Sequence, residues 1–540
     1  MKHFKYLGLI MISVLVLNAC NKKIESYQAN PNSPTSVPPD LILGTVLTDM
    51  SGTGSAGNLG GINSWGEVAQ WDQYHCQNYN YYGNNIYSWG SGSFDPYLVL
   101  KNVVQMQKEV TSRGGAALNP YEAVGKFIQA YYYYNLTSMF GDVPQAEAVA
   151  TPINATPAYT PQEQVYAYVL NVLDSANADL ASLIAANDNS LSPSQDIYFG
   201  GDLTKWQKAV NSFKLRVLVS LSNKAADATL NVPAQFAAIF NSPTTYPIFT
   251  SQADDLAFLY NPGGTATYST YPFNPSNFGS IAARFNMAFT YVNALTSLND
   301  ARVFVTCEPA WSLVGSDTAH PAQFQYFIGA STGEALGTMY ANASANDYSF
   351  INRNRYYSNF TGEPDVLVGY KEMCFNIAEG ITRGWATGNA ESYYKAGIGA
   401  SMAFYGIDTT QAGFTAYFLP PGANSVTQVA PYPVSFNFGT YYAQPSVKLS
   451  AIQDTAIKQI VLQKYITCFQ NSGYEGYFNW RRTGVPVFQG GSGIGNNGII
   501  PLRWAYPSTE QTQNKANWSA ALSNQSFSAD DINQTMWLLK

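Results

Sequence analysis

Two acidic residues next to a turn are the strongest candidates for catalysis. Asp142 lies in a Gly-Asp-x-Pro turn and Glu147 follows five residues later. A pair of carboxyl groups is what glycoside hydrolysis requires. Acids at such turns more often cap or brace the backbone, so we predict that these two do not form an active site. A surface glycoside hydrolase remains an alternative function.

Metal and nucleotide chemistry find little support in the sequence. Beyond the N-terminal leader the only histidines are His75 and His320, which argues against a His-rich metal centre. Glycine patterns at 52–57 and 493–498 match the dinucleotide motif, but neither lies between a strand and a helix, so both are predicted to be loops. No phosphate loop, H-E-x-x-H or G-x-S-x-G motif is present. We predict no catalytic residue, no metal and no cofactor.

Clusters of aromatic and amide side chains are the better candidates for binding. Flat rings and amides suit a ligand that presents apolar faces edged by hydroxyl groups. Three groups stand out, and from them we predict ligand contacts at Tyr79, Tyr81, Tyr82, Asn84 and Trp89, at Tyr271 and Asn274, and at Trp311. Packing in the core is the alternative for each. Trp65 and Trp71 lie nearer to a helical pattern and are predicted to be core residues.

Composition favours an uncharged ligand. Only 12% of residues are charged, against roughly 25% in ordinary soluble domains, and aromatic residues make up 14%. The net charge is −7 and no basic cluster is present, which argues against a nucleic-acid partner.

The N-terminus resembles a lipoprotein signal. A basic start precedes an apolar stretch that is too short to span a bilayer, and Leu17-Asn18-Ala19-Cys20 follows. We expect residues 1–19 to be a signal peptide, Cys20 to be lipidated and residues 20–39 to be a proline-stiffened tether. The fold, a single domain, would then occupy 40–540, with the lipid as its only membrane anchor and the outer membrane as its location.

The four remaining cysteines have no close pairs and no zinc-site spacing. They are Cys76, Cys307, Cys374 and Cys468. A disulfide is permitted but not indicated. Cys374 and Cys468 lie in apolar helical patterns and are expected to be buried thiols.

Apolar residues recur at helical spacing along much of the chain. In the clearest segment, 161–184, the apolar positions repeat every three or four residues after Thr160 as a plausible N-cap. Further helices are predicted at 96–108, 120–139, 203–224, 281–298, 370–385, 390–405 and 451–470. Between them lie segments predicted to be long loops, at 51–92, 243–280, 310–364 and 409–446. Arg216 lies on an apolar helix and needs an acceptor, with Asp202 or Asp300 as candidates.

Blocks of sequence along the chain resemble, in order, the SusD/RagB family of nutrient-binding outer-membrane lipoproteins, in particular its second SusD-like branch. The blocks are Asn30 to Thr35, Tyr131 to Pro144, Asp196 to Ser222, Asp300-Ala301-Arg302, Tyr370 to Gly406, Gln463-Lys464-Tyr465, Trp480 to Gly484 and Pro501 to Glu510. Asp300-Ala301-Arg302 stands where the family usually has D-P-R.

The resemblance implies a mainly α-helical body in which tetratricopeptide-type helix pairs support a loop-rich ligand face. It further implies a cell-surface protein that captures a nutrient and passes it to a SusC-type TonB-dependent transporter. Oligosaccharides are the commonest ligands in the family and peptides the alternative. A surface lipoprotein with a purely structural role is a third possibility.

Overall fold

A computed structural model describes residues 36–52, 65–79, 81, 83–149, 154–261 and 270–540. Helices dominate, and every strand is short and belongs to a two-stranded antiparallel pair. The fold is therefore mainly α, as the sequence predicted.

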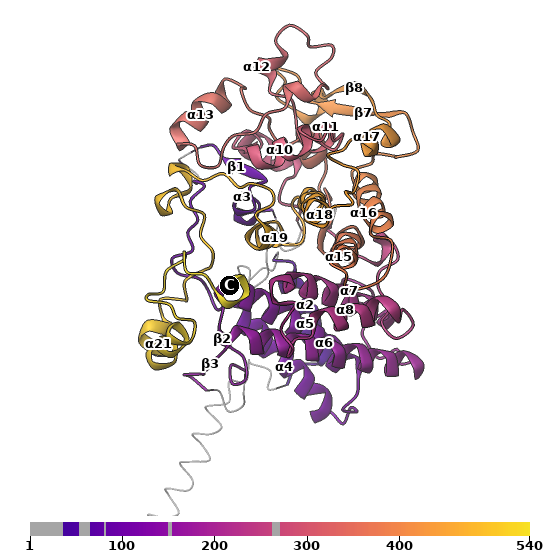
Figure 1. Cartoon of the computed structure of the whole chain (residues 1–540), viewed down its shortest axis with the longest axis vertical. Coiled ribbons are helices and arrows are strands. Elements are labelled where there is room, and N and C mark those ends of the chain that lie inside the picture. The colour runs from indigo at the N-terminus through magenta and orange to yellow at the C-terminus, as the bar shows by residue number, and fades with distance from the viewer. Residues whose placement is uncertain (1–35, 53–64, 80, 82, 150–153, 262–269) are drawn as a thin grey trace, which may run out of the picture.

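A layer of helices near the N-terminus forms the lower part of the molecule in Figure 1. Successive helices of this layer pack against one another, as the helix-pair prediction required. The layer consists of α2 (Pro39–Met50), α4 (Pro96–Ser112), α5 (Pro120–Phe140), α6 (Gln162–Ala185), α7 (Leu203–Ser220) and α8 (Val232–Asn241).

A second group of helices lies above this layer and connects it to an irregular upper lobe (Figure 1). The middle group contains α3 (Glu67–Trp71), α15 (Tyr370–Thr382), α16 (Ala390–Phe404), α18 (Gln453–Thr467) and α19 (Glu475–Thr483). The upper lobe holds α9 (Phe278–Ile281), α10 (Phe289–Thr296), α11 (Val303–Thr306), α12 (Trp311–Val314), α13 (Leu336–Ser344), α14 (Arg353–Tyr357) and α17 (Phe438–Ala443). The C-terminal segment carries α20 (Glu510–Gln513) and α21 (Lys515–Asn524) down one side of the molecule.

Strand pairs join segments that are far apart in the chain. The pairs are β1 (His75–Gln77) with β5 (Phe285–Met287), β2 (Val143–Pro144) with β3 (Tyr159–Thr160), β4 (Leu256–Phe258) with β6 (Asp365–Val368), and β7 (Gly413–Phe418) with β8 (Ala430–Ser435). In the first pair His75 lies opposite Met287 and Gln77 opposite Phe285. An early segment is thereby fixed within the upper lobe.

Most predicted helices are confirmed, with three corrections. The helix predicted at 281–298 exists only as α10, because the preceding residues pair with β1 as strand β5. Helix α6 begins at Gln162 with Pro161 as its N-cap, so Thr160 does not cap it. The stretch 409–446 is not one long loop, because it folds into the β7–β8 hairpin and α17.

Helix α5 is buried on nearly all sides. Asn119 caps its start by accepting a hydrogen bond from the Glu122 N–H at 2.9 Å, and Gly141 ends it with φ 91°. Tyr131 to Tyr134 are all buried, and their rings contact α4, α6, α7 and α19. Consecutive aromatic residues cannot share one helix face, so this run needs more than one packing partner, and these neighbouring helices supply them.

Four charged side chains meet in the core between the lower and middle helices. Arg216 on α7 binds the carboxylate of Glu372 on α15, with its Nε 2.8 Å from Oε1. Lys464 on α18 lies 3.6 Å from Glu372 and 3.5 Å from Glu475 on α19. Arg216 thus pairs with Glu372 and not with Asp202 or Asp300, because Asp202 caps α7 and Asp300 binds Arg302. Sequence spacing could not show which helix would cross α7 at this point.

Neighbouring groups complete this charge cluster. The Tyr134 hydroxyl donates to Glu475 at 2.7 Å, and a cavity of about 10 Å³ beside the cluster has room for one water. Burial opposes ionisation of Glu372, but Arg216 and Lys464 outweigh it and lower its pKa to about 2. The two cations and two anions therefore balance in charge.

The structure bears on two further expectations, the state of the cysteines and the means of membrane attachment. Cys76, Cys307, Cys374 and Cys468 are buried free thiols, as expected for Cys374 and Cys468. Within the described ranges no helix combines the length and the apolar character that a bilayer span needs. Cys20 lies outside the described residues, so its lipidation stays a prediction.

Replacing Glu372 should destabilise the fold strongly. Glu372→Gln leaves the buried Arg216 guanidinium without its anionic partner, which should cost about 3–5 kcal/mol of unfolding free energy. Lys395→Ala is the control, because Lys395 and Glu391 form a pair whose side chains are 46% and 40% exposed, and such pairs contribute under about 1 kcal/mol. Urea unfolding followed by circular dichroism measures both. Equal losses in the two variants would contradict a central role for the cluster.

His75 should make stability depend on pH. It is fully buried, and burial lowers its pKa from 6.5 to about 4. Because the folded chain holds the neutral form, this contribution is present above pH 6.5 and is lost as pH falls towards 4, by about 3 kcal/mol. His75→Gln should therefore lose less thermal stability between pH 7 and pH 4.5 than the wild type. Substitution of the exposed His320 by Gln is the control, and equal pH profiles in all three proteins would refute the prediction.

Candidate ligand-binding site

The β1–β5 pair brings two distant loop segments together in the upper lobe. Directly after β1, the backbone N–H of Asn78 donates to the carbonyl of Arg284 at 2.9 Å. The Asn78 side chain donates to the carbonyl of Ala283 at 3.1 Å. Asn85 returns to the strand and exchanges two hydrogen bonds with the Gln77 backbone, at 2.8 and 2.9 Å. Tyr79 is therefore presented at the base of a loop that is tied at both ends.

Helix α13 supplies a second aromatic ring. Tyr340 stacks on Tyr79 with ring centroids 5.2 Å apart and planes 29° apart. Tyr340, Ala343 and Ser344 are spaced by three and four residues, so they share one helix face. The helix is anchored through the buried Met339, which packs with Cys76 of β1 and with Ala288 and Ala330. One small apolar cluster thus fixes both rings relative to each other.

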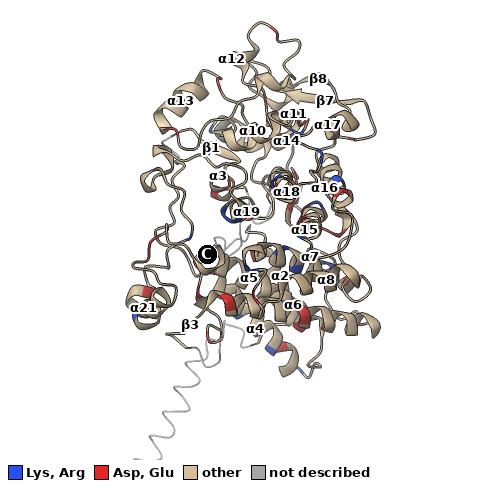
Figure 2. Cartoon of the chain, in the orientation of Figure 1, with Lys and Arg blue, Asp and Glu red and all other residues tan. Residues whose placement is uncertain are grey.

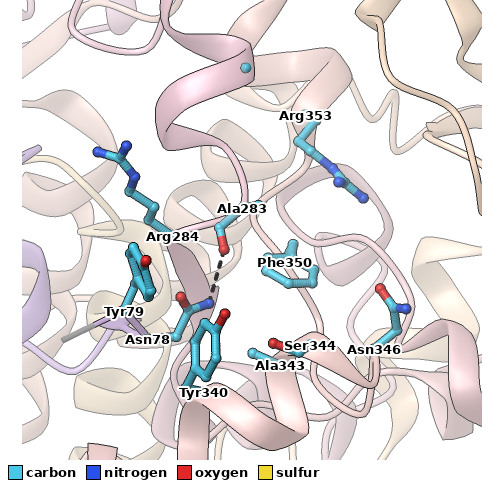
Figure 3. Close-up of a pocket in the computed structure, with 11 residues that line it drawn as sticks. Asn78, Tyr79, Ala283, Arg284, Tyr340, Ala343, Ser344, Asn346, Phe350 and Arg353 are labelled. Atoms are coloured by element: carbon cyan, nitrogen blue, oxygen red, sulfur yellow. Dashed lines mark hydrogen bonds between the residues drawn. The ribbon is translucent and has the colours of Figure 1, made fainter. Parts of the chain in front are cut away.

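These residues line a pocket of about 460 Å³, which we call the Tyr340 pocket (Figure 3). Its wall is completed by the buried ring of Phe350 and by Arg353, the first residue of α14. The Arg353 side chain is held by the carboxylate of Glu308, which lies 2.9 Å from Nε, and its guanidinium carbon lies 5.3 Å from the centre of the Phe350 ring. The lining residues are Asn78, Tyr79, Gly279, Ala283, Arg284, Tyr340, Ala343, Ser344, Asn346, Phe350 and Arg353.

The lining of the Tyr340 pocket suits binding better than catalysis. Two stacked rings offer flat apolar surface, while amide and guanidinium groups offer hydrogen-bond donors. Among the described residues that line it, none is Asp, Glu, His or Cys. It therefore lacks a carboxylate pair for glycoside hydrolysis. Nor do the described residues contain a group of three or more metal-ligating side chains.

The acidic residues near the Gly-Asp-x-Pro turn brace the backbone, as the sequence predicted. The Asp142 carboxylate accepts a hydrogen bond from the Gln162 N–H at 2.8 Å at the start of α6. Burial raises the pKa of Asp142 to about 6. Glu147 accepts from the Asn154 amide at 2.7 Å.

Of the predicted contact residues, Tyr79 lines the Tyr340 pocket, whereas Tyr81 and Asn84 are not among its described lining residues. Tyr81 is 79% exposed, and Asn84 is also exposed, with its side chain accepting from the Ile86 N–H at 2.8 Å. Tyr82 lies outside the described residues. Ligand contact at these three positions stays a prediction.

The other four predicted contact residues lie in the core, which favours the packing alternative over the predicted ligand contact. Trp89 is 1% exposed because it stacks on Trp504 at 3.6 Å, and Tyr271 is fully buried against Trp65. Asn274 is buried with its amide on the Tyr271 carbonyl, and Trp311 is 8% exposed. Their rings and amides are covered by protein, so packing accounts for them. Trp65 and Trp71 are buried, as predicted.

Several residues of the Tyr340 pocket were missed by the sequence analysis. Tyr340, Ala343 and Ser344 lie within 310–364, which was taken as one loop because no long apolar repeat marks it. The spacing of Leu336, Met339, Tyr340 and Ala343 is the helical signal that could have found α13. No sequence signal pairs Arg284 with Asn78, because they are separated by about two hundred residues and meet only through the β1–β5 ladder.

Charge distribution agrees with an uncharged ligand. Figure 2 shows fewer charged residues in the upper lobe than along the lower and middle helices. Of the two arginines that line the Tyr340 pocket, Arg353 is paired with Glu308, whose side chain is fully buried.

A known protein family matches most of the chain. A family model described as "Starch-binding associating with outer membrane" matches residues 32–507. No curated protein matches the chain.

Solved structures of similar shape come from Bacteroides and Flavobacterium. Two SusD homologues of Bacteroides fragilis match with TM-scores of 0.75 and 0.72 at 26% and 28% identity, covering 93% and 94% of this chain and all of theirs. A chitin-binding SusD homologue from Flavobacterium johnsoniae matches with a TM-score of 0.67 at 17% identity, covering 93% of this chain and 99% of its own, which shows a shared fold.

Proposed function

Because the chain belongs to the SusD-like family of starch-binding proteins associated with the outer membrane, we propose that it is a cell-surface lipoprotein that captures a neutral oligosaccharide. In this proposal Cys20 carries the lipid anchor, residues 20–39 form the tether, and 40–540 form a single SusD-like domain. The captured ligand passes to a SusC-type TonB-dependent transporter.

The stacked pair Tyr79–Tyr340 carries the proposal for ligand class. A sugar ring offers a flat face of C–H groups that packs on an aromatic ring, and its hydroxyl edge matches amide and guanidinium donors. Asn78, Asn346 and Arg353 supply such groups around the two rings. Rings held by a rigid strand pair and a packed helix lose little entropy when a ligand binds. The family description and the chitin-binding homologue support a glycan as the ligand class.

A peptide is the second candidate ligand. The same rings and donors could bind peptide side chains and backbone, so a panel of peptides is titrated alongside the saccharides. Hydrolysis is a weaker alternative, because the residues lining the pocket include no acid.

Removing the Tyr340 ring should weaken glycan binding. We expect the soluble domain to bind maltoheptaose or chitohexaose with a Kd in the micromolar to millimolar range, roughly 4–8 kcal/mol of binding free energy. Tyr340→Ala should raise that Kd about tenfold, since loss of a stacked ring costs on the order of 1 kcal/mol beyond its buried area. Tyr340→Phe should retain most of the affinity because the stack survives. Isothermal titration calorimetry measures all three proteins.

Phe360→Ala is the matched control, because Phe360 is a partly exposed ring that does not line the pocket. Unchanged affinity in Tyr340→Ala would show that the ligand binds elsewhere. Binding of peptides alone would favour the second candidate, and release of reducing ends during long incubation would indicate a hydrolase.

The transporter partner should remain attached during gentle purification. Handing a ligand to a barrel requires a wide protein–protein interface, on the order of 1,000 Å² or more. Affinity-tagged full-length protein, extracted in mild detergent, should therefore retain a large β-barrel protein, identified by mass spectrometry. Recovery of the chain alone, at low salt and with maltoheptaose or chitohexaose present, would contradict the partner proposal.

A further inference from the structure

A second pocket, larger than the Tyr340 pocket, lies on the other side of α14. Its volume is about 530 Å³, and we call it the Glu363 pocket. Consecutive residues of α14 divide between the two pockets, because Arg353 lines the Tyr340 pocket while Asn354 and Arg355 line the Glu363 pocket. The rest of its wall comes from α11, the loop after α14, the end of α16 and strand β7.

An ion pair between the half-buried Arg355 and the buried Glu363 forms the floor of the Glu363 pocket. Arg355 binds Oε1 of Glu363 through its Nε and donates to the carbonyl of Phe404 at 3.1 Å. Its guanidinium carbon lies 4.9 Å from the centre of the Tyr405 ring. These contacts fix Glu363, whose side chain is 4% exposed. The pair is neutral overall, so the floor favours an uncharged ligand over an ionic one.

Two buried polar atoms of this floor lack a partner. Across the described part of the chain, neither Oε2 of Glu363 nor the hydroxyl of Tyr405 has a hydrogen-bond partner, although both residues line the pocket. Buried polar atoms in folded proteins are nearly always satisfied by protein, water or ligand. An acceptor and a hydroxyl therefore remain unpaired beneath the wall of a cavity that is large enough for a sugar ring.

The rim of the pocket supplies the other elements of a saccharide site. Tyr417 is 44% exposed and Phe414 is half-buried, so strand β7 offers ring surface. Asn354, Ser358 and Asn359 supply amide and hydroxyl groups on the opposite wall. This combination of flat rings and convergent polar groups is what binding of a neutral polyhydroxylated ligand needs.

We propose that the Glu363 pocket is a second saccharide-binding site, separate from the Tyr340 pocket. A sugar ring packs on the exposed ring of Tyr417, and one of its hydroxyls donates to Glu363, directly or through one water. The ligand class is shared with the proposed function, but the two sites use different residues. Either site can therefore be removed while the other is kept.

Separate removal of each site tests the inference. The double variant Tyr79→Ala/Tyr340→Ala removes the stacked rings of the first pocket, and Asn354→Ala/Tyr417→Ala changes the rim of the second. Both changes of the second pair are at partly exposed positions, and within the described part of the chain Asn354 makes no side-chain hydrogen bond, so the fold should be retained. Thermal melting confirms folding, and Phe360→Ala is again the control, since it lies on the same loop outside the pocket.

Binding of maltoheptaose and chitohexaose is followed by ligand-observed NMR and by calorimetry. We expect the Tyr79→Ala/Tyr340→Ala protein to keep residual binding, and addition of Asn354→Ala/Tyr417→Ala to weaken that residual binding at least fivefold. Glu363→Gln in the same background should weaken it as well, because it replaces a charged acceptor.

The possible results separate this inference from the proposed function. Complete loss of binding in Tyr79→Ala/Tyr340→Ala, or residual binding that is insensitive to Asn354→Ala/Tyr417→Ala, overturns the second site and leaves the first intact. Loss confined to Asn354→Ala/Tyr417→Ala supports the second site and removes the first. Binding of peptides but no saccharide, or of neither class, in the wild type contradicts both.

Discussion

The arrangement of the molecule depends on one buried charge cluster, in which Arg216, Glu372, Lys464 and Glu475 meet from four different helices. These four side chains are almost fully buried, so each needs its opposite charges at close range. That requirement fixes where α15, α18 and α19 cross α7. Shifting one of these helices along its axis would leave a charge unpaired, and an unpaired buried charge is far costlier than a lost apolar contact.

Helix α18 connects the buried charge cluster to the Tyr340 pocket through a chain of contacts. One residue after Lys464, Tyr465 stacks on Tyr74 at 4.7 Å and donates its hydroxyl to the carbonyls of Asp72 and Gln73 at 2.9 Å. Tyr74 returns a hydrogen bond to the Tyr465 carbonyl at 2.9 Å. Strand β1 begins at the next residue and ends two residues before Tyr79. A rigid chain of contacts therefore leads from the buried charges to the ring that we propose binds ligand.

The helical scaffold could be predicted from the sequence because the apolar repeat of a helix lies within the helix itself. An apolar residue at every third or fourth position is visible in α6 without knowledge of its partners. The strand β5 was missed because three residues carry no period, and its existence depends on β1, some two hundred residues away. The candidate site was predicted only in part for the same reason. Tyr79 was found by composition, whereas Tyr340 is placed by the contact of its neighbour Met339 with the distant Cys76. Arg353 is placed by its ion pair with Glu308.

Aromatic content alone could not separate the ligand face from the core. Trp89 and Tyr271 are aromatic residues in predicted loops, as Tyr79 is. Their rings are nevertheless covered by Trp504 and Trp65. What distinguishes a binding ring is the element that holds it at a surface, and α14 shows this most clearly. Asn352 caps this helix by accepting from the Arg355 N–H at 3.0 Å and ties it to β7 through the Tyr417 carbonyl, also at 3.0 Å. Glu308 holds the same N-terminal end by accepting from the Arg353 N–H at 3.0 Å. The side chains of Arg353 and Arg355 are paired with the buried carboxylates of Glu308 and Glu363. A five-residue helix whose two arginines are held in this way can serve two pockets, because neither wall can move without breaking an ion pair.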